Sequence, residues 1–311
     1  MKFYDLNIRG QNFNNDLKLI QEAHKFGWNH LNLNYSPDYF NKALDYKEDL
    51  LNKAFNNDNS LTKSLDADFE VSMGINISNP KNPNEVRKVV NKFRNKTQYL
   101  SCLGGDLKIN RAICENNRID VLSRPYYKRH DSGMNHVLAK LAVKNNVAIE
   151  LCFRDILNQH LKYRANVIAS FKEILKFHRK FQFPLILTTD TKYIYDVRST
   201  RDIVALFKAI GFTNEEIYNG FYKYPKEILD FNKDRNNMVI QGVKVIEGAT
   251  DFTEVHKKEN NNSDFDNLFK DDIEDEDIDE KFDEEYLDLD EVNDLDNMDD
   301  LFDDIKGDFN E

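Results

Sequence analysis

Arginine and aromatic residues follow several short apolar segments of this chain, where their side chains could bind phosphates and bases. Arg9, Arg124 and Arg154 each stand at the end of such a segment. Arg124 is followed at once by a run of aromatic and basic residues, Tyr126, Tyr127, Lys128, Arg129 and His130. Guanidinium groups bind phosphate oxygens through paired hydrogen bonds, and aromatic rings stack on bases. The pattern favours a phosphate-rich ligand, and the candidate RNA-binding residues in these segments are Arg124, Lys128, Arg129 and Arg154.

The opposite interpretation is a solvated loop region in which aspartates neutralise some of these arginines. Asp190 ends another apolar segment, directly after Thr189, and is a candidate for such a structural role. Both interpretations stay open on the residue types alone.

A catalytic metal centre is the competing hypothesis for the same positions. Barrel enzymes that hydrolyse phosphoesters commonly begin with two histidines, one residue apart, that bind a metal on the first strand. Here the corresponding residues are Asn7, Ile8 and Arg9, and an arginine would repel a cation. The seven histidines form no other ligand motif, and the three cysteines form no C-x-x-C pair. We therefore expect no catalytic residue and no metal ion or cofactor bound by this chain.

Common motifs for nucleotide binding, nucleophilic catalysis and export are also absent from the sequence. It contains no P-loop, no G-x-G-x-x-G and no G-x-S-x-G. The N-terminal residues MKFYDLNIRG lack the apolar core of a signal peptide, and no run of about 18 apolar residues occurs. The three cysteines, Cys102, Cys114 and Cys152, are an odd number and are widely spaced, which predicts buried thiols in a reducing compartment. We expect a cytoplasmic protein without a membrane segment.

The charge of the chain is divided between a basic body and an acidic tail. Residues 1 to 235 contain 37 lysines and arginines against 27 acidic residues, a net of +10. Residues 236 to 311 contain 6 against 28, a net of −22, so the whole chain carries −12. A basic folded body is the electrostatic signature of a protein that binds a phosphate-rich partner. The acidic tail conceals this signature in the isoelectric point of the whole chain. Nucleic acid is the leading class of partner on this ground.

Short apolar segments alternate with segments of helical period along the body. Seven segments read as strands, at residues 3–8, 28–35, 69–78, 99–104, 119–125, 147–154 and 184–190. Parallel strands need crossovers of about a dozen residues, which the helical segments supply. We expect an α/β fold, a TIM-like (β/α) barrel that is complete or lacks a strand. An open doubly wound sheet is the alternative, but no glycine-rich turn follows the first strand.

Three other segments have their own expectations. Residues 37–68 are polar and rich in asparagine, so we expect an insertion or a long loop around a short helical patch. Residues 238–248 could form a hairpin or an edge strand. From residue 260 onward, acidic residues alternate with sparse apolar ones, a composition typical of disorder. The predicted domains are a basic barrel, 1–248, and a disordered acidic tail, 249–311.

Several of these segments together resemble the archaeal ribonuclease P protein component 3 family, over about residues 1–248. The resemblance lies in an ordered set of motifs: D-x-x-x-N-R at residues 106–111, the strand V-L-S after Asp120, the segment A-x-x-N-N-V-A-I-E, and D-x-R-S-x-R-D at residues 196–202. The long acidic tail lies outside the family pattern. So does Thr200, where the family usually has proline.

The resemblance implies a barrel related to metal-dependent phosphoesterases that has lost their metal ligands. It also implies a subunit of a ribonucleoprotein whose RNA, with Mg²⁺, removes the 5′ leader of precursor tRNA. Implied partners are ribonuclease P RNA, precursor tRNA, protein component 2 and other protein subunits. Matching positions that would bind RNA are Arg111, Arg164, Arg198 and Arg201, and those of structural or motif character are Asp120 and Asp196.

Arg198 and Arg201 lie three residues apart at the expected start of a helix, where they can face one phosphate. The structural alternative is that Arg198 pairs with Asp196 or Asp202 to fix the loop. For the whole chain, we expect an accessory RNA-binding subunit, which belongs to an endoribonuclease but does not itself cleave. A metal-dependent phosphoesterase of the same barrel superfamily and a protein-interaction scaffold are the alternatives.

Overall fold

The computed structural model describes residues 2–55, 69–157, 161–235, 238–240 and 243–244. These residues belong to the first of two compact units, Met1–Gly248. The expected disordered tail, residues 249–311, lies outside the described residues, so its disorder stays a prediction.

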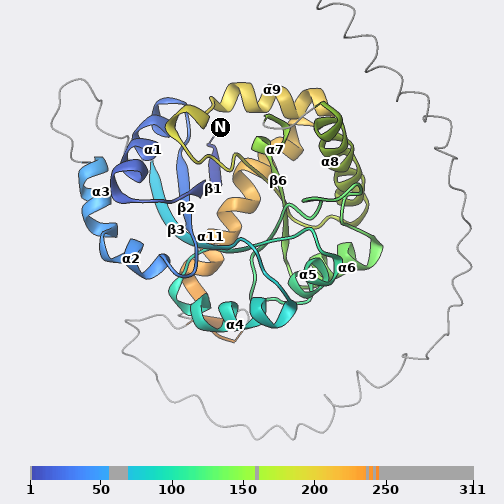
Figure 1. The fold of residues 1–311 in the computed structure, drawn as a ribbon, viewed down its shortest axis with the longest axis horizontal. Coiled ribbons are helices and arrows are strands. Elements are labelled where there is room, and N and C mark those ends of the chain that lie inside the picture. Colours follow the sequence, from blue (N-terminus) through green and yellow to red (C-terminus); the bar gives the residue numbers. More distant parts are fainter. Residues whose placement is uncertain (1, 56–68, 158–160, 236–237, 241–242, 245–311) are drawn as a thin grey trace, which may run out of the picture. The chain divides into compact units, whose positions relative to one another are not determined.

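Seven parallel strands form a nearly closed barrel in which every strand pairs with its neighbour in the sequence. Each of the six connections between consecutive strands contains at least one helix, and these helices lie outside the strands (Figure 1). The strands are β1 (Tyr4–Arg9), β2 (His30–Tyr35), β3 (Glu70–Ile77), β4 (Leu100–Leu103), β5 (Val121–Ser123), β6 (Ala148–Cys152) and β7 (Leu185–Thr188). All seven were predicted from the sequence, because strands of a covered parallel sheet are apolar on both faces.

The helices surround the strands and bury their apolar faces against them. Their bounds are α1 (Phe13–Lys25), α2 (Phe40–Asp45), α3 (Lys47–Phe55), α4 (Pro83–Phe93), α5 (Leu107–Cys114), α6 (His136–Lys144), α7 (Phe153–Leu157), α8 (Leu161–Phe181), α9 (Thr200–Ile210), α10 (Asn214–Tyr218) and α11 (Tyr224–Asp234). Short helical turns lie at Arg94–Lys96, Ile194–Asp196 and Asn219–Lys223. Helix α9 ends at Gly211, which has a φ of 117°, and a capping box of Thr213 with Glu216 begins α10.

A hydrogen-bonded carboxylate helps to close the barrel between β1 and β7, where a regular ladder is missing. The backbone joins there only at an isolated bridge, Ile8 with Thr191, where the Arg9 N–H donates to the Thr191 carbonyl over 2.8 Å. Below this bridge, the fully buried Asp5 carboxylate accepts the N–H of Thr189 at 3.3 Å and also the Thr189 hydroxyl. Asp5 therefore takes the place of a strand carbonyl across the seam.

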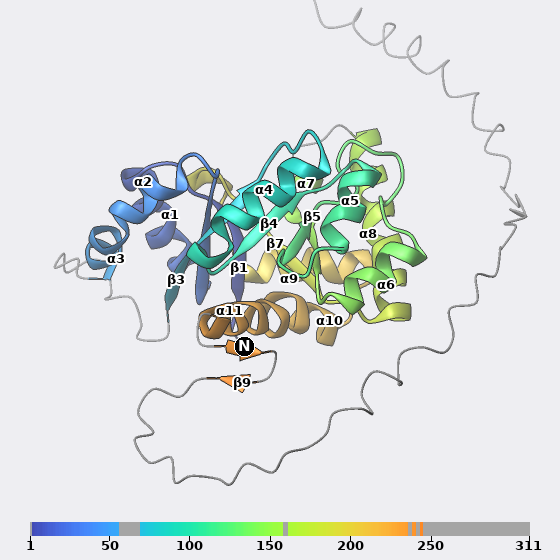
Figure 2. The same ribbon diagram turned by 90° about the horizontal axis from the view of Figure 1, so that it is seen from below.

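Helix α11 covers the N-terminal end of the barrel, as both views show (Figures 1 and 2). Ile228 and Leu229 pack there with Tyr99, which directly precedes β4, and with interior side chains of four strands, Leu6, Val121, Ala148 and Ile186. Because this apolar plug closes one end, only the C-terminal end of the strands is left for a site in the barrel. That end is where barrel proteins carry their function.

Residues 37–68, for which we expected an insertion or a long loop around a short helical patch, are more helical than expected in their first half. Helices α2 and α3 occupy Phe40–Asp45 and Lys47–Phe55, whereas residues 56–68 lie outside the described residues. Phe40, Ala43 and Leu50 are fully buried. Helix α3 packs on α1, so tertiary contacts stabilise two short helices whose polar composition hid the helical period.

The segment after α11 contains a small antiparallel pair, β8 (Met238–Ile240) with β9 (Val243–Lys244). This agrees with the hairpin predicted for residues 238–248. Within the described residues, no helix is long and apolar enough to span a membrane.

Candidate nucleic-acid interface

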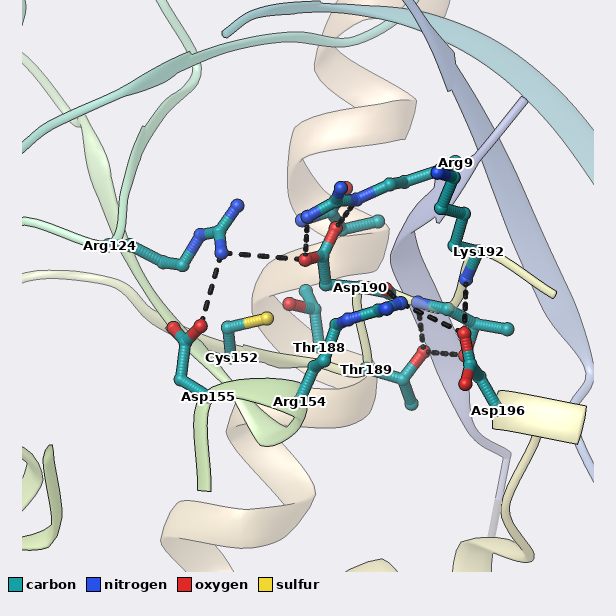
Figure 3. Close-up of polar contacts among 12 residues, drawn as sticks. Arg9, Arg124, Cys152, Arg154, Asp155, Thr188, Thr189, Asp190, Lys192 and Asp196 are labelled. Carbon is teal, nitrogen blue, oxygen red and sulfur yellow. Dashed lines mark hydrogen bonds and ion pairs between the residues drawn. The ribbon is translucent and has the colours of Figure 1, made fainter. Parts of the chain in front are cut away.

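Three arginines, Arg9, Arg124 and Arg154, meet three aspartates at the C-terminal end of the barrel (Figure 3). Arg9, at the end of β1, donates through Nε and Nη2 to both carboxylate oxygens of Asp190, just beyond β7. Arg124, beyond β5, lies 3.4 Å from the same carboxylate and donates to Asp155 of α7 at 3.1 Å. These ion pairs therefore link three segments that are distant in the sequence, β1, β5 and β7, around the C-terminal end of the barrel, which we call the mouth.

Arg154 continues this network toward the outside. Its Nη1 donates to the Asp196 carboxylate at 2.9 Å and to the Asp190 carbonyl at 3.3 Å. The structure places Arg154 in α7 and not at the end of a strand, since β6 stops at Cys152. Asp196 thus has Arg154 as its partner and holds the loop that follows β7.

Burial sets the electrostatics of the mouth. The Arg124 side chain is only 9% exposed and Asp190 is fully buried, whereas Arg9 is 39% exposed. Burial raises the pKa of the Asp155 carboxyl, although Arg124 opposes that rise. The pKa of Arg124 is also raised: burial lowers it, but the Cys152 sulfur and the carboxylates of Asp155 and Asp190 outweigh that effect. The guanidinium therefore keeps its charge inside the protein.

The backbone at the mouth adopts conformations that side-chain-bearing residues rarely take. Arg124, Lys128 and Asp190 have φ of 49°, 57° and 56°. Such left-handed residues cost free energy and persist where surrounding contacts hold them, often at functional sites. The ion pairs of Arg124 and Asp190 supply contacts of this kind.

The two tyrosines after β5 have different environments, which corrects one expectation. Tyr126 is buried, and its hydroxyl donates to Asp155 at 2.8 Å and accepts the Cys152 N–H at 3.1 Å. It cannot stack on a base. Tyr127 is half-buried, with the Arg124 guanidinium 5.3 Å and the Lys128 Nζ 5.4 Å from its ring centre.

The arginines taken from the family motifs lie on the outside of the barrel. Arg111 is 65% exposed and pairs only with Glu115, one turn along α5, at 2.8 Å. Arg201 is exposed and has no hydrogen bond or ion pair within the described residues. Arg198 donates to the Tyr195 and Val197 carbonyls at 2.7 and 3.0 Å. The expected alternative pairing of Arg198 with Asp196 or Asp202 is not observed.

The remaining candidates are partly engaged. Arg129 forms a two-pronged ion pair with Asp131 and donates to the Gly105 carbonyl at 3.0 Å. Arg164 is half-buried, and among the described residues its one hydrogen bond is to the Leu157 carbonyl, at 3.5 Å. Lys128 is exposed. Arg111, Arg201 and Lys128 are thus the candidates with the most accessible charge, although the structure does not bring the three together.

The motif D-x-x-x-N-R has a separate task for each polar residue. Asp106 caps α5 by accepting the N–H groups of Lys108 and Ile109 at 2.8 and 3.2 Å. Asn110 is fully buried, and its amide donates to the carbonyls of Pro125 and Gly133. Asn110 therefore ties α5 to the loop after β5, while the next residue in the motif points its charge to solvent.

Some residues that organise the barrel escaped the sequence analysis. Arg94 is completely buried and donates to Asp120 at 2.6 Å, and the same Asp120 oxygen accepts the Leu100 N–H at 2.8 Å. Inside the barrel, Asn7 donates to the buried Glu150 at 2.8 Å. No sequence motif marks Arg94, because its partner lies 26 positions away; a charged residue at the end of an apolar helical stripe was the one available signal.

The structure offers no metal site in its described part. No group of three or more potential ligands from histidine, cysteine, aspartate and glutamate gathers there. The three cysteines are free and buried, as expected, and burial raises the pKa of the Cys114 thiol to about 12. Asn7 and Arg9, which stand where metal-binding histidines would, are used for hydrogen bonds to Glu150 and Asp190.

Known proteins similar to this chain agree with one another. It is 40% identical to ribonuclease P protein component 3 of Methanothermobacter thermautotrophicus over 247 residues, which are 79% of this chain and 96% of that protein. It is 30% identical to the same component of Methanococcus maripaludis over 237 residues, 73% of this chain and 93% of the relative. In structure it is similar to a chain of archaeal ribonuclease P with mature tRNA, with a TM-score of 0.63 and 30% identity, covering 80% of this chain and all of the other.

The family model described as RNase P subunit p30 matches residues 2–237, which include the whole barrel and α11. This range contains every residue of the ion-pair network at the mouth and every outward arginine described above. The chain therefore belongs to the RNase P subunit p30 family.

Proposed function

We propose that this chain is a protein subunit of ribonuclease P and acts by binding and positioning the catalytic RNA. The observation that carries the proposal is the family match across residues 2–237. The basic body supports it, because cations on a folded surface attract the phosphate backbone of RNA. Arg111, Arg198 and Arg201 are proposed as phosphate contacts, as are Arg164, Arg124, Lys128, Arg129 and Arg154.

The chemistry is proposed to belong to the RNA and not to this chain. Arg9 and Asn7 occupy the positions that a metal-dependent phosphoesterase would use for metal ligands, and both side chains already bind carboxylates. A guanidinium there repels Mg²⁺. The alternative of a metal-dependent phosphoesterase is not favoured, and Mg²⁺ is proposed to act on the RNA catalyst.

The proposed partners are ribonuclease P RNA, precursor tRNA, component 2 and the other protein subunits. A cytoplasmic location belongs to the same proposal. The solved structure that this chain resembles is described as archaeal ribonuclease P with mature tRNA, which supports the RNA partners.

Reconstitution tests the proposal directly. Archaeal ribonuclease P RNA and the other protein subunits are incubated with precursor tRNA and Mg²⁺, with and without this chain, and release of the 5′ leader is followed. We expect faster cleavage with the chain present, and none by the chain alone in Mg²⁺ or Mn²⁺. Equal rates with and without it would refute the role of a subunit, and metal-dependent cleavage by the pure chain would restore the phosphoesterase.

A further inference from the structure

Two adjoining hollows lie at the C-terminal end of the barrel, one of about 260 Å³ and one of about 330 Å³. They share four lining residues, Ser78, Asn79, Leu103 and Tyr127, and together we call them the mouth groove. The larger hollow lies at the low end of the range typical of small-molecule sites, about 300–1,000 Å³. The groove begins beside β1 and β2 and extends over the ends of β3, β4 and β5.

Cations line both halves of the mouth groove. Arg9 and Arg124 line the first hollow, and Lys128 and Arg129 line the second. The one acidic residue among the lining residues is Asp106, which is engaged in capping α5. Arg9 and Arg124 share the carboxylate of Asp190, which is fully buried and does not line the groove, so guanidinium groups and not that carboxylate face a ligand there.

Two residues that line the first hollow each have a buried polar atom without a partner within the described residues. The Nε of Arg124, a side chain more than nine-tenths buried, donates to no acceptor there, and the Oδ1 of Asn76 accepts no hydrogen bond there. Arg9 uses Nε and Nη2 for Asp190. Buried polar groups are normally hydrogen-bonded, so Arg124 and Asn76 keep unused hydrogen-bonding capacity that a ligand reaches once these side chains rotate toward the hollow.

Tyr127 lies where the two hollows meet and supplies an aromatic surface to both. The Lys128 side chain near its ring is exposed and flexible, so a flat ligand can take its place. Guanidinium groups for phosphate, an amide for a base edge and an aromatic ring for stacking are the groups with which proteins bind unpaired nucleotides.

We propose that the mouth groove binds one unpaired nucleotide of RNA, with its phosphate against Arg9 and Arg124 and its base against Tyr127. This site deepens the proposed function and rests on it, since it names the form of RNA that the subunit recognises. A nucleotide in a duplex cannot enter, because both faces of its base are covered by neighbouring pairs.

Equilibrium binding of labelled RNA to the full chain tests this site. The probes are a single-stranded decamer and the same sequence as a duplex, and the variant is Tyr127→Leu. Tyr193→Leu is the matched control, because Tyr193 is also exposed beside a lysine, with Lys192 Nζ at 4.7 Å, but does not line the groove. Loss of one stacked base should weaken single-strand binding by about tenfold for Tyr127→Leu. Duplex binding should stay within about twofold, as should both probes with the control.

An unchanged affinity of Tyr127→Leu for the single strand would overturn the site, and so would equal losses for single strand and duplex. Uridine monophosphate that binds as tightly as the decamer would assign the groove to free nucleotides and overturn its assignment to RNA. These measurements use the chain alone. A negative result for the groove is therefore distinguishable from a negative result for leader cleavage in the reconstituted enzyme.

A second measurement on the unsubstituted chain avoids any effect of the substitution on folding. A decamer that carries 5-iodouridine is cross-linked by ultraviolet light, and the modified peptide is identified by mass spectrometry. We expect a cross-link in the peptide that contains Tyr127. Cross-links confined to peptides outside the groove would overturn the proposal.

Discussion

Arg94 and Arg111 are both arginines, but one is buried in the barrel and the other is exposed on its surface. Arg94 is fully buried and bound to Asp120, at the N-terminal side of β4 and β5. Arg111 is 65% exposed on α5 and has only a neighbour on its own helix, Glu115. A buried guanidinium must have a partner carboxylate, because an unpaired charge is costly in the protein interior. An exposed one is solvated by water and can exchange that water for phosphate.

The comparison teaches that the net charge of the sequence does not tell how many cationic side chains are accessible to RNA. Arg94 is neutralised by Asp120, and the Arg124 charge is shared between Asp155 and Asp190. These pairs hold segments of the barrel together. Exposed cations such as Arg111 and Arg201 add little to the fold and are free for binding.

Removal of the Arg94 guanidinium should have the largest effect on stability. Arg94→Met leaves the Asp120 carboxylate buried with only the Leu100 N–H, so we expect a loss of about 3–5 kcal/mol in the free energy of unfolding. Urea denaturation measures it. The double variant Arg94→Met with Asp120→Leu should lose less, because no unpaired charge remains. If Arg94→Met is as stable as the native chain, the buried Arg94 contributes no more to stability than the exposed Arg111, and the comparison fails.

Asp5 tests whether an acidic group inside the barrel behaves like the buried arginines. Burial raises the pKa of Asp5 from 3.8 to about 6, despite its hydrogen bonds to Thr189. Since the folded pKa lies above the unfolded one, its contribution to stability is fully present below about pH 4. It is lost as the pH rises through about 6, and a shift of about two units corresponds to about 3 kcal/mol.

The variant Asp5→Asn cannot titrate and should lack this loss. Urea denaturation at pH 4, 5, 6 and 7 is compared for the native chain and the variant. We expect the native chain to lose stability relative to the variant across this range. Parallel curves would show that Asp5 stays ionised in the fold, held by the N–H and hydroxyl of Thr189.

The exposed arginines should affect RNA binding and leave the fold nearly unchanged. For Arg111→Gln and Arg201→Gln we expect stability within about 0.5 kcal/mol of the native chain. Each lost phosphate contact should lower the slope of log K against log salt by about 0.7 for single-stranded RNA. Titrations at several salt concentrations measure this slope. An unchanged slope for both variants would place the RNA elsewhere on the barrel.

Much of the fold is determined by local patterns in the sequence. The seven strands follow from apolar runs, and the end of α9 follows from Gly211, which adopts a φ of 117° without the strain of a side chain. The two short helices α2 and α3 do not follow, because packing of α3 against α1 and of α2 against β3 stabilises them and their own composition does not.

Only the tertiary structure decided which arginines are partnered. The sequence by itself placed Arg124, Arg154 and the outward arginines in one list of candidates, since all carry the same charge, and it gave Arg9 no partner. Asp190 lies 181 positions from Arg9, and Asp155 lies 31 positions from Arg124, so no local pattern links them. Chain closure into a barrel brings these carboxylates to the mouth. The resulting contacts and burial depend on distant segments, and they decide which arginines pair with a carboxylate and which stay exposed to solvent.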